Sequence, residues 1–95
     1  MQRRVIERLY EDATKTGNKL VIYTNIPEGV SAEGISFWNF VVNPSESDNV
    51  VKYVTHIDFN VSGVKIQEFV PGDKCTYNNY IEYDTIVSVV EKIDK

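Results

Sequence analysis

The sequence has little cysteine, little histidine and no long apolar run. Cys75 is its only cysteine, so no internal disulfide can form, which fits a reducing compartment. No stretch approaches the roughly 18 apolar residues that span a bilayer. The opening segment MQRRVIERLYED carries charges where a signal peptide needs apolar residues. We therefore expect a cytoplasmic protein with no membrane association.

Positive charge is also scarce. Lysine and arginine together number 10 against 14 aspartate and glutamate residues, which gives a formal net charge of −4. A negative net charge disfavours binding to a phosphate backbone by the overall charge of the protein, so any nucleic acid would have to bind at a small site of its own. Hydrophobic residues make up 42% of the 95 residues, a composition typical of a globular protein. We expect a single domain over residues 1–95.

Residues that carry chemistry are few and poorly placed. A zinc site at His56 and Cys75 would need carboxylates to complete it, and a nucleophilic pair of the two lacks a third group to orient it. A surface histidine and an incidental thiol are the simpler interpretation. The sequence has no glycine-rich phosphate loop and no nucleophile elbow. We predict no enzyme activity, no catalytic residue, no metal site and no cofactor.

The start of the chain has the periodicity of a helix. Apolar side chains recur on one helical face at Val5, Ile6, Leu9, Tyr10 and Ala13. Charged residues fill the other positions and form i,i+4 pairs of opposite sign. Gly17 and Asn18 follow, and both residue types tolerate the left-handed conformation that ends helices. The pattern predicts a helix over residues 2–16.

After residue 18 the pattern changes to that of short strands. Runs rich in Val, Ile, Tyr and Phe occupy residues 19–24, 35–42, 50–59, 64–70, 79–83 and 86–93. Turn-forming residues separate them, and residues 60–63 read as a tight hairpin turn in which Gly63 is free to take a positive φ. In the third run, Val51, Tyr53, Thr55, Ile57 and Phe59 share one face. We expect a meander of five or six strands.

The last apolar run, YIEYDTIVSVVEKI, is interrupted at Asp84 and Thr85. A short meander has two unpaired edges, and closing it into a small barrel removes them. A barrel of that size must bend sharply, so the interruption is interpreted as a corner at which the chain passes from one side of the sheet to the other.

This arrangement resembles the Sm/Lsm family, which includes bacterial Hfq. The family's second motif has the form Ile-Arg-Gly-Asp-Asn-Ile followed by alternating apolar residues, and here residues 81–86 read IEYDTI. The first motif is echoed by HIDFNVSGVKI over residues 56–66. The resemblance implies a mainly β fold: a helix (2–16) and a five-stranded, strongly bent antiparallel Sm-like or SH3-like barrel (19–93). Other small β-barrels and an open α+β sheet are the alternatives.

The family assembles into rings of six or seven subunits, the fourth strand of one pairing with the fifth of the next. The resemblance therefore implies a homo-oligomeric ring, with residues 64–70 and 86–93 as its open edges. It also implies a single-stranded RNA site at Phe59, Asn60, Tyr83, Asp84 and Thr85.

The sequence departs from the family at the RNA site. Glu82 replaces the family's arginine, and Tyr83 replaces its glycine. Tyr77, Tyr80 and Tyr83 are candidate base-stacking residues, although strand or interface contacts are the commoner role of tyrosine. Arg3, Arg4 and Arg8 would form a basic rim in a ring, or simply a solvated helix face.

Two functions fit these observations. The first is a non-catalytic Sm-like ring protein that binds single-stranded RNA or acts as a scaffold for RNA-associated complexes. The alternative is an acidic module that binds another protein and has no nucleic-acid role. RNA binding through phosphates would weaken steeply with added salt, whereas a protein interface would respond little.

Overall fold

A computed structural model describes residues 1–93 of the chain and contains one α-helix, six strands and one short 3-10 turn. In chain order the elements are α1 (Arg3–Thr16), β1 (Lys19–Ser31), β2 (Gly34–Val42), β3 (Tyr53–Phe59), β4 (Gly63–Val70), β5 (Cys75–Glu82), η1 (Tyr83–Thr85) and β6 (Ile86–Lys92). None of the helical residues described forms a segment long and apolar enough to cross a membrane. The mainly β character predicted from the sequence is confirmed.

The predicted helix is confirmed to within one residue. It ends at Gly17, which has a left-handed φ of 73° and donates its backbone N–H to the carbonyl of Ala13. Ile6 and Ala13 are fully buried on the inner face of α1. The helix therefore contributes to the core as its periodicity indicated.

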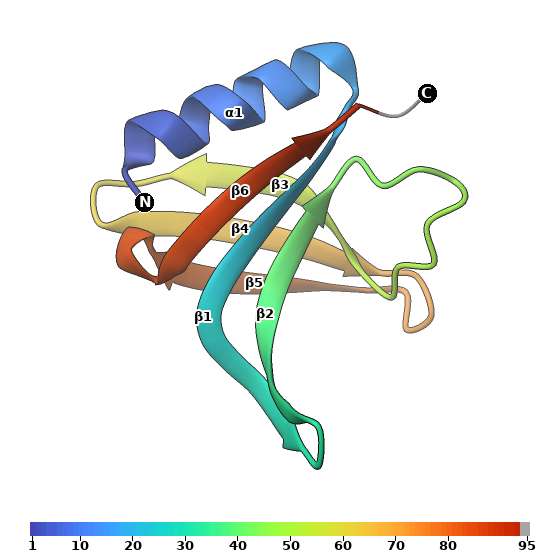
Figure 1. Cartoon of the computed structure of the whole chain (residues 1–95). Helices are drawn as coiled ribbons and strands as arrows, with labels where there is room; N and C mark the ends of the chain where they lie inside the picture. Colours follow the sequence, from blue (N-terminus) through green and yellow to red (C-terminus); the bar gives the residue numbers. More distant parts are fainter. Residues whose placement is uncertain (94–95) are drawn as a thin grey trace.

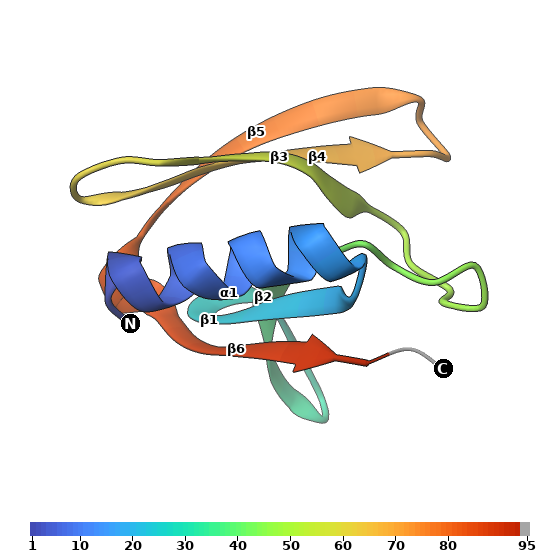
Figure 2. The ribbon, with the colours of Figure 1, turned by 90° about the horizontal axis from the view of Figure 1, so that it is seen from above.

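The strands form one sheet in the order β5-β4-β3-β2-β1-β6. The sheet is strongly bent, so that β3, β4 and β5 lie on one side and β1, β2 and β6 on the other (Figures 1 and 2). Core side chains from both sides, including Leu20, Ile22, Phe40 and Ile66, fill the interior, and α1 lies over one end of it. The core thus joins residues that are distant in the sequence.

The predicted corner is confirmed. The final apolar run breaks into β5 and β6 at the turn η1, residues 83–85. On one side of the break β5 pairs with β4, and on the other side β6 pairs with β1. The chain therefore passes from one end of the sheet order to the other within a single 3-10 turn (Figure 1).

The five-stranded antiparallel barrel is not confirmed in its details. The sheet has six strands, and β5 and β6 each have only one neighbour among the described residues, so the sheet is not closed. It is also mixed, because β2 and β3 meet in a parallel contact at Val42 and Val54. The connection 43–52 joins the two strands at this contact, which consists of one residue pair.

Two predictions about individual strands are wrong. Residues 64–70 are not an open edge, because β4 lies between β3 and β5. The predicted strict alternation in β3 is wrong as well, since Val54 and Ile57, assigned to opposite faces, are both buried. The register shifts between Val54 and His56, and an extra residue at this point moves the following side chains to the opposite face.

Turn-forming residues were misleading in two further places. Residues 25–31, predicted to be a connection, continue β1 into a long hairpin, and residues 75–78 belong to β5. Gly63 begins β4 as the hairpin prediction requires, but it is not among the residues with positive φ. Its lack of a side chain is needed instead because the Tyr80 ring and the Ile81 carbonyl oxygen lie where a Cβ atom would stand.

Candidate nucleic-acid interface

The corner and the turn between β3 and β4 are held together by Tyr83. Its hydroxyl donates a hydrogen bond of 2.6 Å to the carbonyl oxygen of Asn60, and its backbone N–H donates to the Ser62 carbonyl at 3.4 Å. The side chain is only 8% exposed, and this burial raises the pKa of its hydroxyl. The structure therefore brings together the two segments that the family resemblance placed side by side.

The two predicted aromatic residues at this site are engaged within the protein. Phe59 is half-buried and meets Tyr10 edge to face, with ring centroids 5.8 Å apart. Tyr83 is almost fully buried under the turn. Neither ring presents an open face on which a base could stack in this arrangement.

The three predicted polar residues are more accessible. Asn60 and Asp84 are exposed, and neither side chain has a hydrogen-bond partner among residues 1–93. Thr85 is half-buried and donates its hydroxyl to the carbonyl of Glu82 at 2.6 Å. The corner thus offers an amide and a carboxylate for hydrogen bonding, without a stacking platform.

The charge at the corner is mixed but includes little free positive charge. Glu82 and Asp84 are both exposed. Arg3 is close enough to oppose the raised pKa of Tyr83, but its guanidinium lies 3.6 Å from Glu7. The amino terminus of Met1 donates to the carbonyls of Tyr83 and Ile86 at 2.9 Å and 3.1 Å. This environment suits a neutral hydrogen-bonding group better than a phosphate.

A second polar surface lies next to the corner on the outer face of β3, β4 and β5. The strand register aligns Asp58 with Lys65 and Tyr80, and the next row contains His56, Gln67 and Asn78. These residues line an open hollow of about 520 Å³. The sequence pointed to His56 and Tyr80 only as separate candidates, because the alignment of the rows depends on the register and on the bulge in β3.

Tyr77 and Tyr80 are the predicted stacking residues with exposed rings, and of the two only Tyr80 has a side-chain hydrogen bond within residues 1–93. Its hydroxyl lies 2.7 Å from that of Ser62, and its ring lies across Gly63. The residue is nevertheless 49% exposed. An aromatic ring that covers a glycine on the neighbouring strand is also a common way to stabilise a sheet, so this geometry alone does not indicate a ligand.

A buried carboxylate lies on the inner face of β4. Glu68 is 1% exposed, and its Oε1 atom is 3.5 Å from Lys52 Nζ and 3.1 Å from Asn79 Nδ2. Its Oε2 atom has no partner among residues 1–93. Burial raises the pKa of Glu68, and the attraction of Lys52 opposes this effect without cancelling it. The sequence offered no signal for this residue, since an alternating strand pattern does not mark a buried acid.

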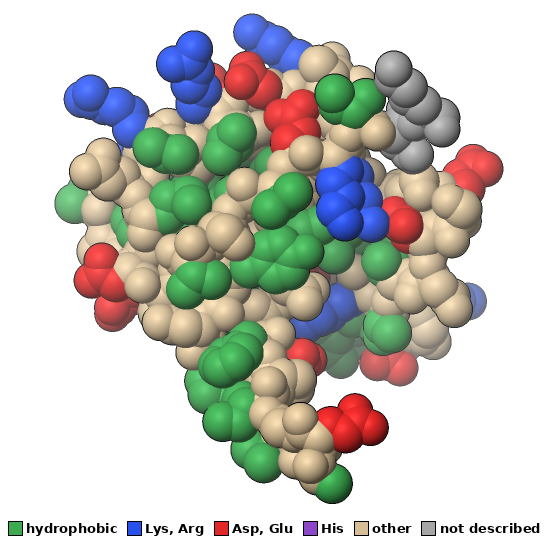
Figure 3. Space-filling model, viewed as in Figure 1, with side chains coloured by type: hydrophobic (Ala, Val, Ile, Leu, Met, Phe, Trp, Pro, Cys, Tyr) green, Lys and Arg blue, Asp and Glu red, His purple; other side chains and the backbone are tan. Residues whose placement is uncertain are grey.

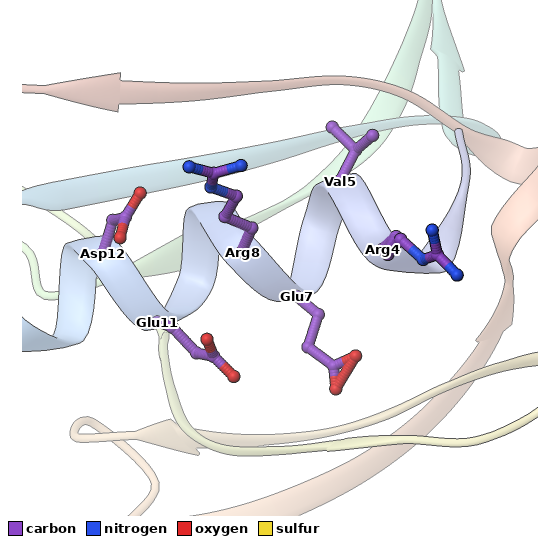
Figure 4. A pocket seen from close by; sticks show the side chains of 6 residues that line it. All are labelled: Arg4, Val5, Glu7, Arg8, Glu11 and Asp12. Atoms are coloured by element: carbon purple, nitrogen blue, oxygen red, sulfur yellow. The ribbon is translucent and has the colours of Figure 1, made fainter.

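The side chains that line the hollow along α1 do not point toward a common centre at which they could bind a ligand together. The hollow measures about 530 Å³ and is lined by Arg4, Val5, Glu7, Arg8, Glu11 and Asp12. Figure 4 shows these side chains fanning out from the solvent side of the helix. Their alternating charges are those of a solvated helix face.

The two residues considered for nucleophilic chemistry do not meet. His56 pairs with Gln67, which pairs with Asn78, so these side chains share the outer face. Cys75 is three positions from Asn78 and therefore points to the other face. His56 instead contacts Asp58 at 3.1 Å. Within residues 1–93, no three metal-ligating side chains gather in one place.

Comparisons with protein-family models, with curated proteins and with solved structures find no match for this chain.

Proposed function

We propose that the protein is a non-catalytic assembly module of the Sm-like kind, in which copies of the chain join edge to edge. The observation that supports this proposal is the position of the two open strands. Among residues 1–93, strands β5 and β6 each have one neighbouring strand, and the corner η1 joins them directly. One domain therefore carries two unpaired edges whose backbone groups can pair with another copy.

The central parts of the two edge strands lack the usual protection against such pairing. Residues 76–81 of β5 and 86–90 of β6 contain neither proline nor a charged residue, the residue types that commonly block an edge. Tyr77 on β5 and Val87 on β6 are large and exposed. Edge pairing of this kind would bury both side chains.

Pairing β5 of one copy with β6 of the next is a heterologous contact. Such a contact closes into a ring when the rotation between copies permits it, and otherwise continues as a filament. The Sm-like resemblance favours a ring of six or seven copies. RNA binding at Asn60, Asp84 and Thr85 remains a prediction from the same resemblance. The aromatic ring on which a base stacks in that family would have to come from another residue, because the rings of Phe59 and Tyr83 are engaged within the protein.

Two matched variants test the assembly. Tyr77→Lys places a charge on the β5 edge, and Val87→Lys places one on the β6 edge. Val61→Lys is the control, because Val61 is exposed in the turn between β3 and β4 and belongs to neither edge. The solution mass would be measured by light scattering after size exclusion, with and without nuclease treatment.

A heterologous assembly predicts that each edge variant is a monomer on its own. A mixture of the two should form a two-copy complex, because each variant retains one intact edge. The control should keep the wild-type mass. A wild-type monomer, or a large assembly that neither edge variant disrupts, would contradict the proposal; loss in only one variant would indicate symmetric pairing of like edges instead.

A further inference from the structure

The hairpin of β1 and β2 projects from the body of the protein as an arm, residues 26–37. Pairing of β1 with β6 ends at Thr24, and β2 contacts β3 only at Val42. Beyond these points the two strands pair only with each other among residues 1–93 (Figure 1). Both edges of the arm are therefore open within this part of the chain, and a two-stranded ribbon by itself is only marginally stable in water.

The arm exposes large apolar side chains where a free surface ribbon would carry polar ones. Val30 and Ile35 are direct cross-strand partners and are 80% and 55% exposed. Phe37 shares the face of Ile35 two residues along β2 and is 46% exposed. Figure 3 shows apolar side chains running along one side of the arm. A clustered apolar surface of this kind is typical of a contact site.

The charged side chains of the arm itself are both acidic, and the cation nearest to them, Lys52, shares a hollow with Glu28 and is paired with the buried Glu68 at 3.5 Å. Segment 20–51 contains no lysine or arginine, and the only charged residues of the arm are Glu28 and Glu33. Both are exposed, and neither forms an ion pair within residues 1–93. Asp48, by contrast, is paired with Lys19 at 3.0 Å. The arm therefore carries two acidic side chains that form no ion pair within residues 1–93.

We propose that the arm binds an extended, basic polypeptide segment of a partner protein, which adds as a strand to the edge of the hairpin. Main-chain hydrogen bonds to the open edge would supply affinity, as in other cases of strand addition. Apolar side chains of the segment would cover Val30, Ile35 and Phe37, and its lysine or arginine side chains would face Glu28 and Glu33. The required partner sequence alternates apolar and basic residues.

The test uses three short peptides with blocked termini: alternating lysine and valine, alternating lysine and serine, and alternating glutamate and valine. Calorimetry would measure affinity, and the fluorescence of Trp38, the only tryptophan, would report contact near Phe37. We expect binding of the lysine–valine peptide, with the other two at least about tenfold weaker.

Arm variants locate the binding. Val30→Ser and Ile35→Ser should each weaken binding of the lysine–valine peptide by about tenfold, since each removes apolar surface from the contact. Val61→Ser is the matched control, because Val61 is an exposed valine outside the arm. Glu33→Gln should reduce affinity and its salt dependence, whereas Glu46→Gln in the connection 43–52 should not.

Several results would overturn the proposal. Equal binding of the lysine–serine peptide would indicate nonspecific attraction to an acidic protein, and equal binding of the glutamate–valine peptide would remove the requirement for a basic partner. Binding to zwitterionic phosphatidylcholine vesicles that Val30→Ser abolishes would assign the arm to a membrane surface. The edge assembly is tested separately, because the arm variants should keep the wild-type solution mass.

Discussion

Glu68 shows how one buried residue departs from the pattern of its strand. Its neighbours Ile66 and Val64 on the same face are apolar core residues, yet Glu68 is just as buried. Lys52 supplies a partial counter-charge while its ammonium lies 5.6 Å from the centre of the Trp38 ring. The carboxylate therefore has one cation, one amide and an unpartnered oxygen, which is an expensive environment for a negative charge.

This environment predicts a pH dependence of stability. Because burial raises the pKa of Glu68 above its ordinary value of 4.5, the folded protein holds this proton more tightly than the unfolded chain. The stabilising contribution is fully present below the unfolded pKa and is lost as the pH rises through the folded pKa. The groups that face Glu68 are Lys52, Asn79 and, by its charge, Glu28.

Glu68→Gln should remove this contribution. We expect the free energy of unfolding of the wild type to fall, relative to that of the variant, as the pH rises from about 4.5 towards neutrality. Urea unfolding at several pH values, followed by Trp38 fluorescence, would measure the difference. Glu82→Gln is the control at an exposed glutamate. Parallel pH profiles for the wild type and Glu68→Gln would show that Glu68 does not titrate in this way.

At the scale of elements, the corner was predictable because the local sequence and the strand pairing change at the same place. Strand-forming residues flank a break at Asp84 and Thr85, and at this break the chain stops pairing with β4 and begins to pair with β1. The helix was predictable for the same reason. The bulge in β3 was not, because an extra residue inside an apolar run leaves no mark in the composition and is decided by pairing with β4.

The corner also depends on one side-chain contact that can be removed. Tyr83→Phe deletes the hydroxyl that donates to the Asn60 carbonyl and leaves the ring in place. We expect a loss of about 0.5–1.5 kcal/mol in the free energy of unfolding, the usual contribution of one such bond. Urea unfolding would measure it.

Tyr77→Phe is the control for this variant, because the Tyr77 hydroxyl makes no hydrogen bond within residues 1–93 and the residue is exposed. If both variants were equally stable, the hydroxyl of Tyr83 would not contribute to holding the β3–β4 turn against η1. A loss much larger than the expected range would indicate that the Asn60 carbonyl becomes buried without a partner.

At the scale of the whole molecule, the sequence indicated an N-terminal helix and a strongly bent sheet, but not which surfaces remain open. The edge strand is β5 and not β4, because β5 pairs along the whole of β4. This pairing was not predicted, since residues 75–78 have the composition of a turn. The arm was missed for a related reason: Pro27 and the nearby glycines signal a turn, while the ribbon accommodates them through shifts in register. Both errors concern pairing between strands, which local composition does not encode.

The whole-molecule charge bears on the predicted RNA site. The net charge of −4 and the exposed Glu82 and Asp84 make the corner a poor place for a phosphate. If the corner has the geometry that the Sm-like resemblance implies, Glu82→Arg should supply a cation at the position where that family has its arginine. We expect a gain in affinity of about tenfold to a hundredfold for a short single-stranded oligouridine at low salt, because a charge-assisted hydrogen bond contributes roughly 1.5–3 kcal/mol.

Fluorescence anisotropy at increasing salt would measure this affinity, with Glu46→Arg as a control for the same change of charge at an exposed site away from the corner. The gain in Glu82→Arg should come with a steeper loss of affinity on adding salt, by about 0.7 in the logarithmic slope for one added phosphate contact. The gain in affinity should also disappear when the substitutions Asn60→Ala and Asp84→Ala are added to Glu82→Arg. Equal gains in both arginine variants would reflect net charge alone, and the corner would then have no role in binding RNA.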